Sequence, residues 1–394
     1  MNTSIRNAAL LATATMLAGS VAACGGSEEA QRSQGRQHRG GDGAAAGIQR
    51  AGAQRPFTLV ASGDVLAHDS VIRQAREDAG GHGYNFRRML SGAKPLASRA
   101  DLAICHMETV YGKARGPFTG YPTFKTPPHV AAALKDTGYR SCSTASNHSM
   151  DDGVDGVRRT LGAMDKAHLK HVGTARSARE RTRPAMMTAG GAKVAQLSYT
   201  YGTNGIPVPK KKSWAVNRID PKRIIADARA ARRAGADIVV ASMHWGTEYQ
   251  EAPNAQQLKV AKQLTASRDH GRKDIDLIIG THAHTPQAYE KVNGTWVVYG
   301  MGDQLAGAMP NPRGTMSSAG RFTFVPPKGG QRQWAVRKAE FVPFMVQTSP
   351  RFNVVDLGQK AGREGGGDRT RAYRTIRHAV LSRGAAKQGL RMGH

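Results

Sequence analysis

Six polar residues that can bind a metal ion each follow an apolar run of the chain. Two of them, His282 and His284, are one residue apart in the stretch IIGTHAHT, where a buried strand is expected to end. Residues i and i+2 of an extended segment point to the same face, so both imidazoles can face one centre or two adjacent centres. The complete set is Asp64, Glu108, Asn147, His244, His282 and His284.

This mixture of oxygen and nitrogen donors without a thiolate suits Mn²⁺, iron or Zn²⁺ at a catalytic site more than a structural zinc site. Two such ions about 3.5–4 Å apart, bridged by one carboxylate, activate water for attack on a phosphorus or carbonyl centre. Glu108 is the expected bridge, and His148 is the expected proton donor to the leaving group. Each residue alone has a turn or capping role as its ordinary alternative, but their joint occurrence at strand ends favours a site.

The elements that must position these residues alternate between strands and helices. Short β-branched runs such as FTLVASGD and ADIVVASMHWG precede the polar residues, and amphipathic stretches such as PKRIIADARAARRAG separate them. The pair Asn293-Gly294 is a strong signal for a hairpin turn. This alternation predicts a layered α/β fold, in which ligand sites form at the carboxyl ends of the strands.

The net charge and the N-terminus limit the partners and the location. Lysine and arginine total 57 against 29 acidic residues, and the resulting charge of +28 favours a polyanionic partner. The first 24 residues contain an arginine, a short apolar stretch and the sequence Val-Ala-Ala-Cys, which is typical of a bacterial lipoprotein signal with lipidation at Cys24. A plain cleaved signal or a short anchor is the alternative. We therefore expect export, attachment to the outer face of the cell membrane through an N-terminal lipid, and no nucleic-acid partner.

Composition divides the rest of the chain into three parts. Residues 25–55 contain almost no large apolar side chain and are expected to form a disordered tether. Residues 56–350 carry the alternating pattern and are expected to form one folded domain. Residues 351–394 are basic and interrupted by glycines, which predicts a solvent-facing tail with a short helix around residues 370–381.

Seven motifs make the chain resemble the CapA-type proteins of capsule and poly-γ-glutamate synthesis, whose fold is similar to that of the calcineurin-like metallophosphatases. The motifs are SGDVLAHDSV, ADLAICHMET, TASNHSMDDGVDGVRRTL, GTARS, MHWGTEYQEAP, IIGTHAHTPQ and VVYGMGDQL. The resemblance implies a four-layer αββα sandwich of the metallophosphatase type and a dinuclear-type site made of the residues above. It also implies a role on poly-γ-glutamate or a related anionic polymer of the cell envelope.

Some residues depart from the pattern of that family. His106 stands where the family usually has asparagine, so it is either an additional donor or a replacement that changes local hydrogen bonds. His68 follows the first motif's aspartate by four residues instead of the Asp-x-His spacing of metallophosphatases. It therefore either folds back toward the site or has a surface or capping role. Asp303, in the late Gly-Met-Gly-Asp-Gln string, is expected near the same rim.

Three residues are expected to bind the substrate. Trp245 and Glu248 come from one loop and Tyr201 from the end of another strand, although packing of the loop is the alternative for the tryptophan. Two cysteines, Cys105 and Cys142, end strands that could be neighbours. Buried free cysteines are favoured over a disulfide, because the sequence does not set the distance between them.

Three functions fit these observations. The leading hypothesis is a lipid-anchored CapA-like protein with a metal-dependent hydrolase or transferase site for the synthesis, processing or attachment of a γ-linked glutamate polymer. The second is a phosphoesterase acting on an envelope phosphate ester, which the missing Asp-x-His spacing disfavours. The third is a non-catalytic scaffold that holds a polyanion, for which binding would survive chelation and weaken with salt.

Overall fold

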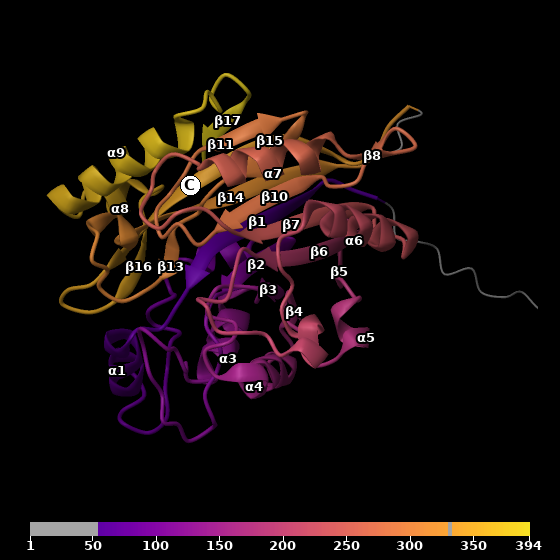
Figure 1. The fold of residues 1–394 in the computed structure, drawn as a ribbon. Helices are drawn as coiled ribbons and strands as arrows, with labels where there is room; N and C mark the ends of the chain where they lie inside the picture. Colours follow the sequence, from indigo (N-terminus) through magenta and orange to yellow (C-terminus); the bar gives the residue numbers. More distant parts are fainter. Residues whose placement is uncertain (1–53, 330–332) are drawn as a thin grey trace, which may run out of the picture. The chain divides into compact units, whose positions relative to one another are not determined.

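A computed structural model describes residues 54–329 and 333–394 (Figure 1). The predicted lipoprotein signal (1–24) and nearly all of the predicted tether (25–55) lie outside the described residues. In the part of the chain that the structure describes, every helix is too short or too polar to span a bilayer.

Two large sheets form the centre of the molecule. Over the described residues, the first sheet has nine strands, of which seven follow one another in the order β16 (Asn353–Asp356), β15 (Ala335–Gln347), β14 (Met316–Val325), β1 (Phe57–Val65), β2 (Leu102–Met107), β3 (Ser141–Ser143) and β4 (Lys170–Val172). The other two are β13 (Asp303–Leu305), which pairs with β1, and β17 (Leu390–Met392), which pairs with β15. The second sheet has six described strands in the order β11 (Tyr289–Val292), β12 (Thr295–Val298), β10 (Leu277–Thr281), β7 (Ile238–His244), β6 (Ala192–Thr200) and β5 (Ala185–Ala189).

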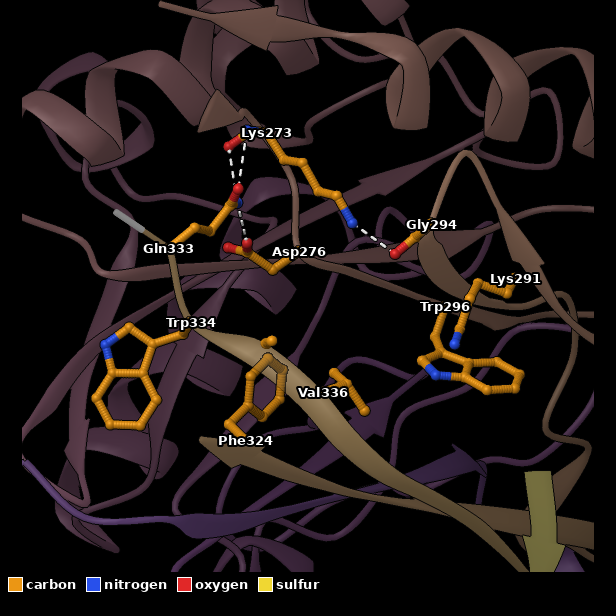
Figure 2. Close-up of a pocket in the computed structure, with 10 residues that line it drawn as sticks. Lys273, Asp276, Lys291, Gly294, Trp296, Phe324, Gln333, Trp334 and Val336 are labelled. Carbon is orange, nitrogen blue, oxygen red and sulfur yellow. Dashed lines mark hydrogen bonds between the residues drawn. The ribbon is translucent and has the colours of Figure 1, made fainter. Parts of the chain in front are cut away.

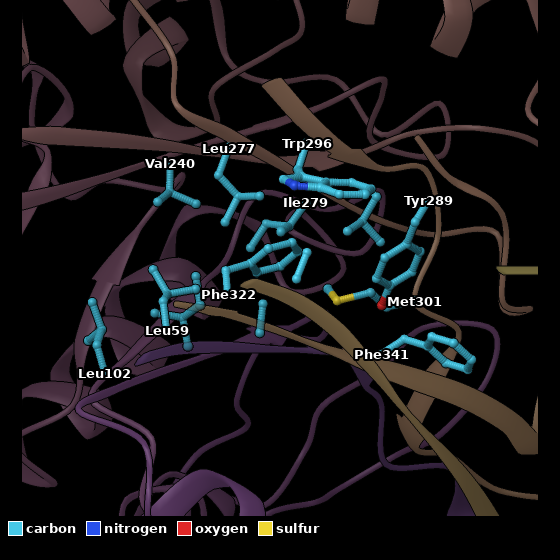
Figure 3. Close-up of a cluster of buried hydrophobic side chains, with 14 of the residues drawn as sticks. Leu59, Leu102, Val240, Leu277, Ile279, Tyr289, Trp296, Met301, Phe322 and Phe341 are labelled. Atoms are coloured by element: carbon cyan, nitrogen blue, oxygen red, sulfur yellow. The ribbon is translucent and has the colours of Figure 1, made fainter. Parts of the chain in front are cut away.

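The inner faces of the two sheets pack against each other through an apolar core (Figure 3). Leu59 and Leu102 come from the first sheet, and Val240, Leu277 and Ile279 from the second, and all are buried. The central strands β1 to β4 and β6, β7, β10 and β12 pair in parallel. Because central parallel strands are covered on both faces, strands such as β7 and β10 are buried at every position and are mainly apolar instead of alternating.

Helices cover the outer face of each sheet. Over the first sheet lie α1 (Asp69–Glu77), α2 (Lys94–Ser98), α3 (His129–Thr137) and α4 (Gly153–Lys166), which bury residues such as Val71 and Leu134. Over the second lie α6 (Pro221–Arg233) and α7 (Ala255–Ala266), which bury residues such as Ile224 and Leu264. The order helix, sheet, sheet, helix confirms the predicted four-layer αββα sandwich.

Short elements connect these layers. They are α5 (Ala178–Arg181), η1 (Lys210–Ala215), the small hairpin of β8 (Arg268–Asp269) and β9 (Arg272–Lys273), η2 (Pro312–Thr315) and α8 (Lys360–Arg363). The Asn293-Gly294 turn joins β11 to β12 as an antiparallel hairpin, as the sequence predicted.

Residues 351–394 belong to the fold and do not form a solvent-facing tail. Both β16 and β17 pair with β15, and α9 (Gly367–Leu381) buries Ile376 and Val380 in the core. The exposed arginines of α9 lie on one face of the helix, and its apolar residues lie on the buried face. The basic composition of the whole segment therefore did not indicate the apolar stripe. The expected domain boundary at residue 350 is thereby corrected, because the described domain continues to His394.

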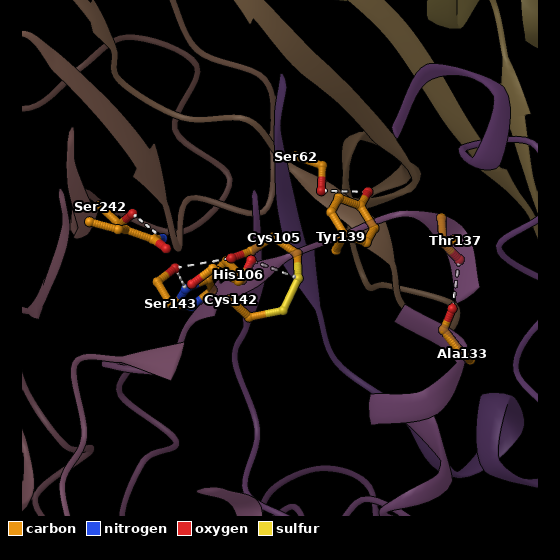
Figure 4. The surroundings of a disulfide bond; sticks show 11 residues. Ser62, Cys105, His106, Ala133, Thr137, Tyr139, Cys142, Ser143 and Ser242 are labelled. Carbon is orange, nitrogen blue, oxygen red and sulfur yellow. Dashed lines mark hydrogen bonds between the residues drawn. A yellow bond between two sulfur atoms is a disulfide. The ribbon is translucent and has the colours of Figure 1, made fainter. Parts of the chain in front are cut away.

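A disulfide joins Cys105 and Cys142 across the neighbouring strands β2 and β3, where the two residues are register partners (Figure 4). Their Cα atoms are 4.4 Å apart, a distance that a disulfide spans. The preference for two free cysteines was therefore wrong. The distance depends on the pairing of two strands that are far apart in the sequence, and the sequence did not set it.

Candidate metal centre

The carboxyl ends of four strands bring the predicted ligands together. Asp64 lies near the end of β1, Glu108 follows β2, His244 ends β7, and His282 and His284 follow β10. All five side chains are buried. Four sets of three ligand-type atoms lie within 4.8 Å of one another: Asp64, His106 and His244; Glu108, His244 and His282; Asp64, Glu108 and His284; and Glu248, His282 and His284.

Two carboxylates lie between the histidines. Glu108 Oε1 is 3.6 Å from His244 Nε2 and 3.8 Å from His284 Nε2. Asp64 Oδ1 is 3.6 Å from His106 Nε2 and 3.7 Å from His244 Nδ1. Each carboxylate therefore borders imidazoles from two segments of the chain.

The two histidines of the Gly-Thr-His-Ala-His string reach the site through a turn and not through an extended strand. Strand β10 ends at Thr281, and both His282 (φ 92°) and His284 (φ 51°) have positive φ. Residues other than glycine seldom adopt this region, and they do so where surrounding contacts hold them. Here the N–H of His282 donates to Asp64 Oδ2 at 3.1 Å, and His284 Nδ1 is 2.8 Å from Asp303 Oδ1. The extended geometry assumed from the sequence was wrong, although the two rings do meet at one site.

Several buried polar atoms of the site have no hydrogen-bond partner among the described residues. They are Asp64 Oδ1, His106 Nε2, both carboxylate oxygens of Glu108, His282 Nδ1 and Asp303 Oδ2. A buried polar atom without a partner costs about 1–3 kcal/mol, and such atoms are rare in folded proteins. Their oxygen and imidazole chemistry suits a divalent metal ion placed among them, so the residues present fit such an ion.

The charges of the cluster agree with this fit. Burial raises the pKa of Asp64 to about 8, and it raises the pKa of Glu108 well above its usual range. Burial lowers the pKa of His106 and of His282 to about 3, so both imidazoles are neutral, as metal ligands must be. Burial opposes a charge on His284 as well, but the neighbouring carboxylates raise its pKa well above the ordinary value. Among the histidines of the cluster, the pKa values of His106, His244 and His282 are lowered and only that of His284 is raised.

Asn147, His244 and His106 form one side of the cluster. Asn147 Oδ1 is 2.7 Å from His244 Nε2, and the ring of His106 stacks on that of His244 with 4.7 Å between centroids. His106 Nδ1 is 2.7 Å from Ser143 Oγ, which leaves its unpartnered Nε2 facing the carboxylates. Of the two roles that the sequence left open for His106, this geometry favours the additional donor.

His148 lies beside the cluster and is oriented by Asp151. His148 Nδ1 is 2.7 Å from Asp151 Oδ2, which also accepts a hydrogen bond from the N–H of Phe124 at 2.8 Å. Burial and then the neighbouring imidazoles, His148 among them, lower the pKa of His282, so His148 lies within electrostatic reach of the predicted ligands. Sequence reasoning missed the orienting role of Asp151. Its spacing of three residues from His148 was the available signal.

The chain is similar to known proteins over the part that carries this site. The family model described as bacterial capsule synthesis protein PGA_cap matches residues 58–308, a range that contains every predicted site residue. The chain belongs to this family. Two relatives are the PGA biosynthesis protein CapA of Bacillus subtilis (strain 168), 33% identical over 171 residues, and the capsule biosynthesis protein CapA of Bacillus anthracis, 27% identical over 174 residues.

The matches to these relatives are partial. Each covers 43% of this chain, and they cover 43% and 41% of the two relatives, so the chain spans less than half of the length of either protein. A solved structure, the calcineurin-like phosphoesterase YfkN from Bacillus subtilis, is 17% identical with a TM-score of 0.43. That comparison covers 84% of this chain and 98% of the other.

One predicted substrate-binding residue of this PGA_cap domain lies elsewhere. Trp245 is fully buried in the core between the second sheet and its helices, and its Nε1 donates to the carbonyl of Tyr299 at 2.9 Å. It cannot line a substrate groove, so that prediction was wrong and the packing alternative is correct. The sequence could not distinguish a packing role from substrate binding for Trp245, because this residue directly follows the site residue His244.

The remaining predicted residues lie around the rim of the site. The ring of Tyr201 is 4.4 Å from that of His282, and the exposed Glu248 shares a ligand set with His282 and His284. His68 precedes α1, and its Nδ1 accepts a hydrogen bond from the N–H of Gly307 at 3.0 Å. The side chain of His68 makes no capping hydrogen bond to α1 and instead fixes a loop next to the site, so the capping role is not observed.

Proposed function

We propose that this PGA_cap-family protein acts on an anionic polymer of the poly-γ-glutamate type through a metal-dependent hydrolase or transferase site. One observation carries the proposal: the unpartnered buried ligand atoms that come from the ends of separate strands and meet in one place. Burying them costs stability without a cation, and residues of this kind are typical of functional sites. The relatives' printed names, which refer to PGA and capsule biosynthesis, support the choice of polymer.

The proposed ligands come from both sheets. Asp64 and Glu108 supply carboxylate oxygens, and His282 and His284 supply imidazole nitrogens, with His106 and His244 beside them. When bound, a pair of divalent ions would activate water and polarise the carbonyl oxygen of the polymer. The carboxylate of Asp303 holds Nδ1 of His284, which leaves Nε2 facing Glu108; such outer partners orient metal-binding histidines. Manganese, iron and zinc all suit this donor set.

We assign His148 the proton transfer. Asp151 accepts a hydrogen bond from the Nδ1–H of His148. The other ring nitrogen, Nε2, is therefore the one that can take up a proton and release it to the leaving amine. Tyr201, at the rim next to His282, is placed to donate its hydroxyl to a carboxylate of the bound polymer.

The location is part of the proposal. Disulfides persist in oxidising compartments, so the bond between Cys105 and Cys142 supports export. The net charge of +28 supports a polyanionic partner. Lipidation at Cys24 rests on the signal sequence, and a Cys24→Ser variant is expected to move from the membrane fraction to the medium.

The test combines metal analysis with two substrates. The wild type, a Glu108→Gln variant and a His282→Ala/His284→Ala double variant are purified and analysed for bound manganese, iron and zinc. Their hydrolysis of poly-γ-glutamate and of bis(p-nitrophenyl) phosphate is measured. We expect the wild type to contain metal and to shorten the polymer, and the variants to lose both properties.

The other outcomes select the alternatives. Cleavage of the phosphodiester alone would identify a phosphoesterase. Polymer binding that survives chelation, without cleavage of either substrate, would identify a scaffold. Unchanged metal content in the double variant would show that the two histidines are not principal ligands.

A further inference from the structure

Three cavities follow one another along the surface next to the metal centre. The first, of about 370 Å³, is lined by Tyr201, Val208 and Arg218, among others. The second, of about 620 Å³, shares Val208 and Arg218 with the first and adds Arg181. The third, of about 320 Å³, shares Arg181 and Asn217 with the second. We call this series of cavities the basic groove.

The groove begins at the wall of the metal centre. The ring of Tyr201, which lines the first cavity, is 4.4 Å from the ring of His282 and 6.4 Å from that of His244. The N–H of Tyr201 donates to the carbonyl of His244 at 3.0 Å. Arg218 Nη2 donates to the carbonyl of Tyr201 at 3.4 Å, so the first cation of the groove is attached to the residue that borders the centre.

Backbone pairing holds the lining in place. Arg218 bridges in parallel to Thr200 at the end of β6, and the N–H of Asn217 donates to the carbonyl of Gly173 at 2.8 Å. The segment around Arg218 is therefore tied to the ends of strands in both sheets. The Arg218 side of the groove is thus fixed by strand pairing, whereas the rest of the first cavity is formed by the connecting segment 201–208 between β6 and η1.

The charges of the groove are unbalanced. Its basic lining residues are Lys170, Arg176, Arg181, Arg183, Arg218 and Arg223, and its acidic ones are Asp165, Glu180 and Asp220. Asp165 and Glu180 both pair with Arg176, and Asp220 caps α6 by accepting from two backbone N–H groups. The acidic side chains are thus already engaged.

Three cations along the groove remain for a ligand. Arg181 pairs with Asp227, but Lys170, Arg183 and Arg218 form no salt bridge with any described residue. All three are exposed. The first two line the third cavity, and Arg218 lines the other two, so unpaired positive charge is present over the whole length of the groove.

We propose that the basic groove binds an extended polymer with a carboxylate on each repeat and leads it to the metal centre. This inference rests on the proposed function, whose substrate it positions. Cations at successive points fit a linear polyanion better than a single small anion. Guanidinium groups pair with carboxylates through two parallel hydrogen bonds, and a chain held by several weak contacts can slide along them.

A second cavity with basic residues shows that positive charge alone does not identify the substrate-binding surface (Figure 2). It has a volume of about 370 Å³ and contains Lys273 and Lys291. Lys273 Nζ donates to the carbonyl of Gly294, and Lys291 Nζ lies 4.9 Å from the centroid of the Trp296 ring, so each ammonium group has one such contact, as Arg218 has with the carbonyl of Tyr201. This cavity contains Asp276, which precedes β10, whereas the metal centre follows that strand. It therefore lies at the other end of the sheet.

The experiment compares two triple variants of the full chain. One carries Lys170→Gln, Arg183→Gln and Arg218→Gln in the groove. The matched control carries Arg371→Gln, Arg374→Gln and Arg377→Gln on the exposed face of α9, with the same loss of charge. The affinity for fluorescently labelled poly-γ-glutamate is measured at low and at physiological salt. We expect the groove variant to bind about tenfold more weakly and the control to change by less than about twofold.

The outcomes separate this inference from the proposed function. Equal loss of affinity in the two triple variants would overturn the groove, whatever the metal content of the wild type. Inorganic polyphosphate of equal charge that binds as tightly, and with the same sensitivity to the groove substitutions, would overturn the polycarboxylate assignment. Metal content is expected to be the same in the wild type and in both triple variants. A single Arg218→Glu variant with an intact circular dichroism spectrum provides a second test of the groove, because it too should bind the labelled polymer more weakly than the wild type.

Discussion

Two buried regions of the same sandwich have opposite chemistry. The core between the sheets is lined by apolar side chains, whereas the metal centre collects carboxylates and imidazoles with unpartnered atoms. The same strands supply both regions: Leu59 and Asp64 belong to β1, and Ile279 precedes His282 at the end of β10. Burial by itself therefore does not stabilise a protein. Its free-energy contribution is favourable for apolar side chains and unfavourable for polar atoms without partners.

The difference can be stated in free energy. Each square ångström of apolar surface removed from water contributes about 25 cal/mol, so a buried leucine or phenylalanine contributes about 2 kcal/mol. Each unpartnered polar atom costs about 1–3 kcal/mol. The core therefore maintains a fold in which the candidate metal centre is costly to bury, and substitutions in the two regions should act in different ways.

The largest expected effect is in the core. Phe322 on β14 is fully buried between the sheets, and Phe322→Ala should lower the free energy of unfolding by about 4 kcal/mol, because it leaves a cavity. Urea denaturation measures this change. The control is the half-exposed neighbour Thr323, for which Thr323→Ala should cost less than about 1 kcal/mol. Folded Phe322→Ala protein should keep its metal, and loss of metal would show that the two regions are not separate.

The disulfide, which packs among the apolar residues on the helix-covered face of the first sheet, gives the next effect. Replacing both Cys105 and Cys142 by alanine should lower the free energy of unfolding by about 3 kcal/mol, since the bond closes a long loop of the unfolded chain. Reduced wild type should unfold at the same urea concentration as the double variant. If the oxidised wild type also unfolds at this urea concentration, the disulfide contributes nothing to stability.

The sequence was sufficient where local pattern determines structure. Apolar runs ending in polar residues located β1, β2, β7 and β10, and the amphipathic stretch PKRIIADARAARRAG located α6. The ligands then followed from the rule that such strands end at one edge. The αββα layering came from the family resemblance, because periodicity alone gives the number of elements and not their stacking.

The rest depends on contacts between distant segments. Trp245 and His244 are adjacent in the sequence, and the packing of α7 buries the tryptophan away from the site. The positive φ of the two histidines is maintained by Asp64 and Asp303, which no local window contains. The prediction of a solvent-facing C-terminal tail was wrong for the same reason, because its apolar residues are buried only through packing beside β15.

A smaller effect should come from the residue that orients His284. Asp303→Asn keeps the size of the side chain but removes the charge next to Nδ1, and it should weaken metal binding by about 10–100-fold. Competition with a chelator of known affinity measures the change. Stability without metal should change little. Unaltered affinity would mean that His284 is not a ligand or that its orientation does not depend on Asp303.

The smallest expected effect on stability has the opposite sign from that of Phe322→Ala. Glu108 buries two carboxylate oxygens without partners, so Glu108→Gln relieves part of the cost of burial in metal-free protein. We expect the free energy of unfolding in excess chelator to rise by about 1 kcal/mol or to stay unchanged. Without chelator, the order should reverse, because only the wild type gains stability from a bound ion. A clear loss of stability in chelator would show that Glu108 is held by contacts like those of the core, and the contrast between the two regions would fail at its central residue.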